Sequence, residues 1–92
     1  MSLVSIIMPF LDPDVRFFQE AIESVLAQSH PDWELILVDD GSGEAAREVA
    51  ARMAKDHADR LKVLHHPDYA NRGASASRNL GIHHATGAFI AF

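Results

Sequence analysis

Cysteine is absent from the 92-residue sequence, which excludes disulfide bonds and every site that depends on a thiolate. No apolar run is long enough to cross a bilayer, and residues 1–10 lack the basic start and long apolar core of a signal peptide. These absences fit a reducing compartment. We therefore expect a cytoplasmic protein, with peripheral membrane attachment open for a longer parent protein.

Basic residues are few: the chain has 8 Lys and Arg residues against 13 Asp and Glu residues, which gives a formal net charge of −5. A broad electrostatic surface for nucleic acid is therefore not expected, and an anionic ligand would have to be held by a few placed groups. Apolar residues make up 48% of the chain, and no long low-complexity segment occurs. The chain can form the core of one small domain or of part of a larger one.

The most informative segment is 34–42, with the sequence ELILVDDGS. Its apolar residues do not alternate with polar ones, which predicts a strand covered on both faces of a parallel sheet. Asp39 and Asp40 follow, at the sheet edge where ligands of open α/β folds bind, and their side chains should point to opposite faces. The alternative is that both acids form a turn and that Ser42 or an acid caps the next helix.

Three further apolar runs, at residues 3–8, 61–64 and 87–92, predict strands. Pro9 is expected to end the first strand, which is central, whereas alternation within the second run places that strand nearer an edge. Helical spacing and strong helix formers predict three helices, over residues 13–28, 45–55 and 74–85. Asp12 and Ser42 are the expected N-caps of the first two.

The resulting order is β-α-β-α-β-α-β with short links. It predicts an α/β fold with a mostly parallel sheet, right-handed crossovers and helices on both faces. The glycine-rich loop of dinucleotide-binding domains is absent, because the first strand leads into PFLDP.

A second informative segment is 71–81, with the sequence NRGASASRNLG. It carries glycine and two arginines and opens a helix whose first amides are unpaired, all of which suit a phosphate-bearing ligand. The alternative is a helix start with solvated arginines.

Six histidines include two adjacent pairs, His65–His66 and His83–His84. Adjacent side chains diverge on a strand or helix, so a histidine metal site is not predicted. A serine hydrolase is not predicted either, because no strand-Gly-x-Ser-x-Gly-helix elbow occurs.

Six segments in order resemble the amino-terminal half of a family 2 glycosyltransferase. They are residues 4–9 (VSIIMP), 21–28 (AIESVLAQ), 33–42 (WELILVDDGS), 71–73 (NRG), 77–81 (SRNLG) and 85–92 (ATGAFIAF). The resemblance spans the whole chain. It implies a Rossmann-like, GT-A type half domain, in which residues 1–92 form the amino-terminal nucleotide-binding part and the remainder of the domain is absent.

For the site, the resemblance implies that Asp40 accepts a hydrogen bond from the nucleobase and that Asp39 supports the turn or the ribose. Pro9, Phe10 and Leu11 would line the base pocket. The family often has Thr-Tyr or Val-Tyr after the proline, so an aromatic stack on the base would here be either lost or shifted to Phe10. The other motif residues expected beside the donor are Gly41, Asn71, Gly73 and Arg78, with Arg78 and the 71–73 loop near the diphosphate.

The resemblance also implies an inverting transfer from a nucleoside diphosphate sugar to a carbohydrate or lipid-linked acceptor. A divalent metal, Mn or Mg, would neutralise the leaving diphosphate, and a further acid would activate the acceptor hydroxyl. Both groups are expected beyond Phe92. No residue of the chain is therefore assigned as catalytic or as a metal ligand, and the segment alone is expected to be inactive.

The alternative function is a non-catalytic nucleotide-binding or regulatory α/β module. A receiver-like domain is disfavoured, because receivers carry their acidic pair after the first strand and here it follows the second. The last strand, with Ala88, Phe89, Ile90 and Phe92, would be an exposed apolar edge, which predicts self-association.

Overall fold

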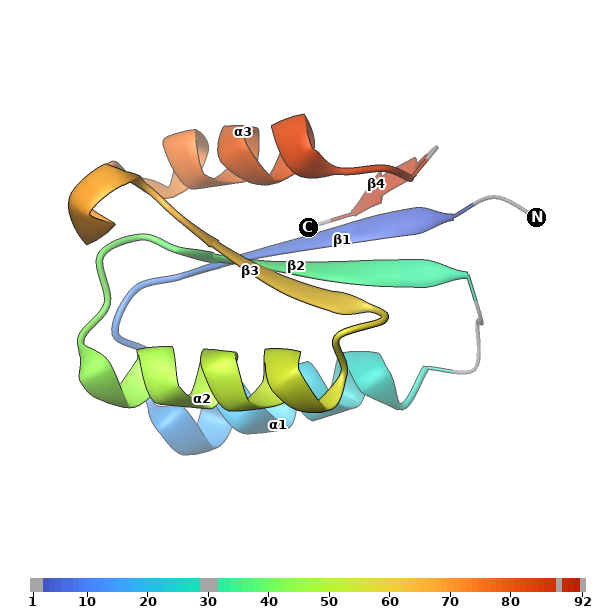
Figure 1. Cartoon of the computed structure of the whole chain (residues 1–92), viewed down its shortest axis with the longest axis horizontal. Coiled ribbons are helices and arrows are strands. Elements are labelled where there is room, and N and C mark those ends of the chain that lie inside the picture. Colours follow the sequence, from blue (N-terminus) through green and yellow to red (C-terminus); the bar gives the residue numbers. More distant parts are fainter. Residues whose placement is uncertain (1–2, 29–31, 88, 92) are drawn as a thin grey trace.

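The computed structural model describes residues 3–28, 32–87 and 89–91. The elements follow the expected order (Figure 1): β1 (Val4–Phe10), α1 (Val15–Leu26), β2 (Trp33–Asp39), α2 (Glu44–Asp56), β3 (Leu61–His65), the short 3-10 helix η1 (Pro67–Tyr69), α3 (Ala74–His84) and β4 (Phe89–Ala91). Of these, only η1 was not expected from the sequence.

The four strands form one parallel sheet in the order β3-β2-β1-β4. β1 and β2 are therefore central, and β3 lies at an edge, as predicted. α1 and α2 cover one face of the sheet, and α3 covers the other (Figure 1). The predicted α/β architecture, with a parallel sheet between helices on both faces, is confirmed.

β2 is the most buried element, since all seven of its residues are buried. Its side chains alternate between two apolar clusters. Leu35 and Leu37 pack into the larger cluster with α1 and α2, whereas Ile36 and Val38 belong to the smaller cluster beneath α3. Because of this strict alternation, the side chains at the end of the strand must also point to opposite faces of the sheet.

Two strand boundaries predicted from the sequence are wrong. Pro9 does not end β1 but lies within it, in register with Val38 of β2. β4 pairs only with Val4–Ile6, so Pro9 lies where β1 has one described neighbour, and a proline is tolerated there. Trp33 belongs to β2 and not to the preceding link, because its ring is buried in the larger cluster.

Both expected N-caps are also wrong. α1 is capped by Asp14, whose Oδ1 accepts hydrogen bonds from Arg16 N and Phe17 N. Gly43 occupies the N-cap position of α2 and makes no side-chain hydrogen bond there. Asp12 and Ser42 bond to each other's loops instead.

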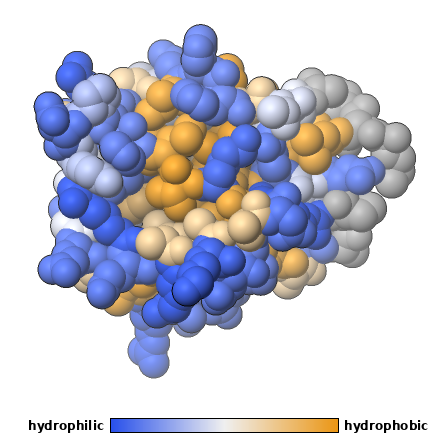
Figure 2. Space-filling model, in the orientation of Figure 1, coloured by the Kyte–Doolittle hydropathy of each residue, from blue (hydrophilic) through white to orange (hydrophobic). Residues whose placement is uncertain are grey.

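The sheet edges differ in what they expose. Figure 2 shows apolar surface in the middle of the face that carries β3 in Figure 1, surrounded by hydrophilic side chains. Val63 and Leu64 of this edge strand are half-buried, and Lys62 adds a charge of the kind that discourages edge pairing. On β4, Ile90 is 40% exposed.

Within the described part of the chain, no helix combines the length and the apolar character needed to span a bilayer.

Glu34 joins three strands and the segment that leads into β4. Its Oε2 accepts hydrogen bonds from Ser5 Oγ at 2.5 Å, Thr86 N at 2.8 Å and Thr86 Oγ1 at 2.9 Å, and Oε1 pairs with Lys62 Nζ at 3.2 Å. Burial alone would raise the pKa of Glu34. The hydrogen bonds from Ser5, Thr86 and Lys62 outweigh burial and lower the pKa from 4.5 to about 2.

A carboxyl group with a lowered pKa stabilises the fold above its unfolded pKa of 4.5 and loses that contribution as the pH falls toward 2. We expect Glu34→Gln to lower the free energy of unfolding at neutral pH by about 2 kcal/mol and to flatten the decline of stability across this acid range. Urea unfolding at a series of pH values measures both. The matched control is Glu48→Gln, at an exposed position of α2; equal effects of the two variants would contradict the assignment.

Candidate functional site

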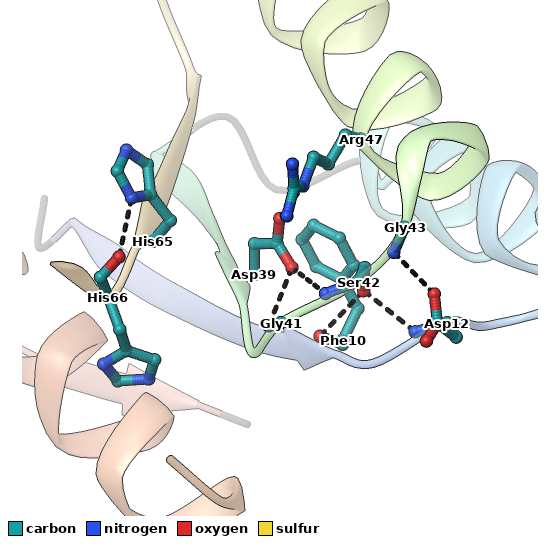
Figure 3. A network of polar contacts seen from close by, with 9 residues as sticks. All are labelled: Phe10, Asp12, Asp39, Gly41, Ser42, Gly43, Arg47, His65 and His66. Carbon is teal, nitrogen blue, oxygen red and sulfur yellow. Dashed lines mark hydrogen bonds and ion pairs between the residues drawn. The ribbon is translucent and has the colours of Figure 1, made fainter. Parts of the chain in front are cut away.

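Asp39 ends β2 and holds the turn that follows. Asp39 lies on the same face of the strand as Leu35 and Leu37, so its side chain points to the face covered by α1 and α2. Oδ1 accepts hydrogen bonds from Gly41 N at 3.1 Å and Ser42 N at 2.7 Å, and Oδ2 pairs with Arg47 Nε of α2 at 3.3 Å (Figure 3). Both carboxylate oxygens are thus engaged within the protein.

The loops after β1 and β2 are tied together by two reciprocal hydrogen bonds (Figure 3). Asp12 N donates to Ser42 Oγ at 2.8 Å, and Gly43 N donates to Asp12 Oδ1 at 2.6 Å. Ser42 is buried, at 2% exposure. The two side chains expected to cap helices therefore fix the spacing of the two loops that flank the candidate site.

Asp40 points to the opposite face, toward α3. Its Oδ1 accepts hydrogen bonds from Arg72 N at 2.7 Å and Gly73 N at 3.0 Å, so the carboxylate anchors the loop that precedes α3. Oδ2 has no hydrogen-bond partner within residues 3–28, 32–87 and 89–91. The residue as a whole is 4% exposed.

A cavity of about 270 Å³ lies beside Asp40 at the carboxyl ends of β1 and β2. Six residues of the sequence prediction line it together with Ala74, namely Pro9, Phe10, Leu11, Asp40, Asn71 and Gly73. Phe10, however, is only 6% exposed, and its ring packs against Phe18 with ring centroids 4.6 Å apart. Phe10 therefore offers no free ring face for stacking on a base, and the shift of the aromatic stack to this residue is not supported.

Gly41 packs directly against the loop that Asp40 anchors. Its φ is +94°, and an added Cβ would lie 2.9 Å from both Asn71 N and Asn71 Cβ. Glycine is therefore required both by the left-handed backbone and by the close approach of the two loops. Gly41 shapes the site through this contact and does not line the cavity.

The same loop is held from its other end by a stack of three side chains. Tyr69 lies against the imidazole of His65, with centroids 3.9 Å apart, and under the Arg47 guanidinium, 4.1 Å from the ring centroid. Both contacts favour the observed placement of η1, whose Asp68 and Tyr69 have positive φ values. A cavity of about 380 Å³ lies beside this stack and Asp39, on the face of the sheet opposite Asp40.

Arg78 lies outside the Asp40 cavity. It is exposed and lines a groove of about 640 Å³ that runs along β1 toward Ala91. Pro9 and Ala74 line both spaces, so the groove adjoins the cavity. The expectation that Arg78 lies near a diphosphate is compatible with this position and stays a prediction.

The structure adds a pair of residues that sequence reasoning missed. His66 is 7% exposed, and its Nε2 lies 2.9 Å from Ser77 Oγ and 3.6 Å from Asp40 Oδ1. His65, its neighbour in sequence, is exposed, so the adjacent histidines do diverge. No local sequence pattern indicates His66, because its partners Asp40 and Ser77 lie 26 and 11 positions away in the sequence.

Among the described residues, no group of three or more His, Asp or Glu side chains is placed so that it could hold a metal ion. Among the described residues that line the Asp40 cavity, Asp40 is the only acid, and its Oδ1 already accepts hydrogen bonds from two amides.

A parallel sheet in this order between helices on both faces (Figure 1), with an acidic turn at its carboxyl edge, is the architecture of a GT-A type α/β domain. The sequence model of the family described as "Glycosyl transferase family 2" matches residues 5–92, and the chain belongs to this family.

Individual relatives agree with this assignment. EpsJ of Bacillus subtilis (strain 168), described as an uncharacterized glycosyltransferase, is 43% identical over 92 residues, which are all of this chain and 25% of EpsJ. RC0461 of Rickettsia conorii (strain ATCC VR-613 / Malish 7), described in the same way, is 40% identical over 89 residues, or 97% of this chain and 14% of that protein. The chain thus spans a quarter or less of the length of these two relatives.

The fold is also that of a solved enzyme. The mannosyltransferase PcManGT from Pyrobaculum calidifontis, in complex with GDP-Man and Mn²⁺, superposes with a TM-score of 0.84 and 24% identity. The match covers 97% of this chain and 26% of that enzyme.

The contact between Gly41 and Asn71 can be tested by adding a single methyl group. Gly41→Ala imposes both strain at positive φ and a clash, whereas Gly73→Ala imposes strain alone, because no atom lies within 4 Å of the added Cβ. We expect losses in the free energy of unfolding of about 1–2 kcal/mol for Gly73→Ala and about 2–4 kcal/mol for Gly41→Ala. Chemical denaturation measures both, and equal losses would show that the loops are not in contact.

Proposed function

We propose that this chain is the donor-binding half of an inverting glycosyltransferase and that Asp40 recognises the nucleobase of a nucleoside diphosphate sugar. One observation supports this proposal above the others. Asp39 has both oxygens engaged within the protein, whereas Asp40, which lines a cavity, has one oxygen anchored and the other without a hydrogen-bond partner among the described residues. An anchored carboxylate with a spare acceptor suits a base that presents an N–H group.

The size and lining of the cavity agree with a flat, partly apolar ligand. Pro9, Leu11 and Ala74 provide apolar surface, and the volume of about 270 Å³ is just below the usual range for ligand sites, which starts at about 300 Å³. Leu11 is 48% exposed at the rim and can cover a base from one side. The base would thus be held by one strong acceptor and by van der Waals contact, without an aromatic stack from Phe10.

The diphosphate would extend from this cavity toward the start of α3. This helix has 11 residues, begins at Ala74 and has Gly73 as an N-cap without a side-chain hydrogen bond, so no capping side chain occupies its first amides or the positive end of its dipole. Arg78 follows one turn later beside the adjoining groove. Chain charge alone would repel a diphosphate, because the net charge is −5, so these local groups have to supply the attraction.

In the parent protein we propose that the sugar is transferred to an acceptor hydroxyl of a carbohydrate or lipid-linked acceptor. A divalent metal bound by residues outside this chain would stabilise the leaving diphosphate. The residues of this chain bind and orient the nucleotide, and none of them takes or gives a proton in the transfer.

The test is titration of uridine and guanosine diphosphate, each with Mn²⁺, into the wild-type chain and Asp40→Asn. Asparagine keeps an oxygen for the Arg72 and Gly73 amides but replaces the free acceptor with a donor, so the loop is retained while recognition is lost. We expect the dissociation constant to rise at least about tenfold for the nucleotide that binds. The matched control is Asp59→Asn, an exposed acid with the same charge change.

Absence of binding by the wild-type chain would overturn the nucleotide site. If Asp40→Asn leaves binding unchanged, the role of Asp40 is overturned, and the cavity beside Asp39 becomes the favoured nucleotide site. The second candidate function, a non-catalytic nucleotide-binding module, shares this site and predicts the same titration; it would be favoured if the whole parent protein bound the nucleotide and transferred no sugar.

We expect the chain by itself to bind a donor without turning it over. Incubation with UDP-sugars and GDP-mannose, Mn²⁺ and simple sugar acceptors should release nucleoside diphosphate no faster than a sample without the chain. Sugar transfer at a rate close to that of a complete family enzyme would show that the catalytic groups lie within residues 1–92.

We also propose that the chain self-associates through β4. This strand ends the sheet, pairs on its described side with Val4–Ile6 of β1, and presents Ile90 at 40% exposure. Light scattering over a range of concentrations should show dimers or larger species, and Ile90→Lys should shift the distribution to monomer. A wild-type chain that stays monomeric at high concentration would refute the proposal.

A further inference from the structure

His66 lies where three elements meet behind Asp40. It follows β3 directly, its imidazole reaches Ser77 of α3, and the same ring nitrogen approaches the carboxylate that follows β2. All three side chains are buried, with exposures of 7% for His66, 0% for Ser77 and 4% for Asp40. A buried polar cluster of this kind is costly unless its hydrogen bonds are satisfied.

The Asp40 carboxylate determines which tautomer of the His66 imidazole is favoured. A bare Nε2 lone pair would face Asp40 Oδ1 at 3.6 Å and repel it, so the form with a proton on Nε2 is favoured. Nε2 then donates to Ser77 Oγ at 2.9 Å, with its positive N–H edge turned partly toward Asp40. His66 therefore places a third positive group beside Oδ1, in addition to the amides of Arg72 and Gly73.

All three groups lie around the same oxygen. They oppose rotation of the carboxylate away from this orientation, because an intermediate angle would break two amide hydrogen bonds and the contact with the imidazole at once. The plane of the carboxylate is thereby fixed in a residue that lines the cavity. Ser77 supports this arrangement from α3 by fixing the imidazole plane.

We propose that His66, held by Ser77, is a positioning residue that fixes the Asp40 carboxylate and, through it, the 71–73 loop. The part of this proposal that concerns ligand affinity rests on the proposed nucleotide site; the part that concerns the loop does not. His66 itself does not line the Asp40 cavity, so it acts through Asp40 and not by touching the ligand.

The test compares His66→Phe, which keeps a ring without a donor, with His66→Gln, whose amide can donate near the position of Nε2. Amide hydrogen exchange of Arg72 and Gly73, followed by NMR, reads the Asp40 hydrogen bonds without any ligand. We expect exchange at both amides to be about tenfold faster or more in His66→Phe and within about threefold of wild type in His66→Gln. His83→Phe, at an exposed position of α3, controls for the added ring.

The amide of Leu37, in the middle of buried β2, serves as the reference for global opening. Faster exchange at Arg72 and Gly73 with Leu37 unchanged supports the positioning role. An equal rise at all three amides, or no rise at Arg72 and Gly73, overturns it, because His66 would then contribute only to overall stability or to nothing measurable.

Nucleotide affinity provides the second measurement. His66→Phe should weaken binding of the nucleoside diphosphate about tenfold in the wild-type background and not at all in an Asp40→Ala background, since alanine removes the carboxylate through which the effect passes. Equal weakening in both backgrounds would overturn the proposal. If the wild-type chain binds no nucleotide, the proposed function fails, while the exchange experiment still decides the role of His66.

Discussion

The site depends on the alternation of side chains along a strand that is buried on both faces. Leu35 and Leu37 must enter one apolar cluster, and Ile36 and Val38 must enter the other. The register cannot slip by one residue without exchanging these sets, which would place the side chains that fit one cluster in the other. Asp39 and Asp40 inherit this division, so two chemically identical neighbours receive opposite surroundings.

The two acids consequently do different work. Asp39 closes its own turn with local amides and an arginine of α2, as acidic turn residues commonly do. Asp40 instead captures amides 32 and 33 positions away and brings the start of α3 to the carboxyl edge of the sheet. One carboxylate stabilises the shape of the loop, and the other brings distant parts of the site together and keeps an oxygen to spare.

Much of the fold could be predicted from the sequence because its signals are local. The unbroken apolar run at 35–38, the alternating run at 61–64 and the helical spacing between them determine element type and order without tertiary information. The predicted helix caps are wrong because a long-range contact outweighs the local preference of each side chain. Asp12 and Ser42 have the chemistry of helix caps, yet each bonds across the gap between two loops.

The site was predictable to a similar degree. The motif residues converge at one edge, and six of the nine line one cavity. The sequence could not show that Phe10 turns its ring into the core against Phe18, because both inward and outward directions suit a strand end. Nor could it show His66 behind Asp40, because that contact exists only after β2, β3 and α3 have packed.

The stack of Arg47, Tyr69 and His65 has a practical consequence for following the molecule in solution. The chain has one tyrosine and one tryptophan. Tyr69 lies in the segment that leads to the Asp40 loop, between a cation and an imidazole, while Trp33 lies at the opposite end of β2 beneath Arg60. Each end of the sheet thus carries its own natural chromophore, so near-ultraviolet spectra can separate a rearrangement around the loop from melting of the whole core, without any label.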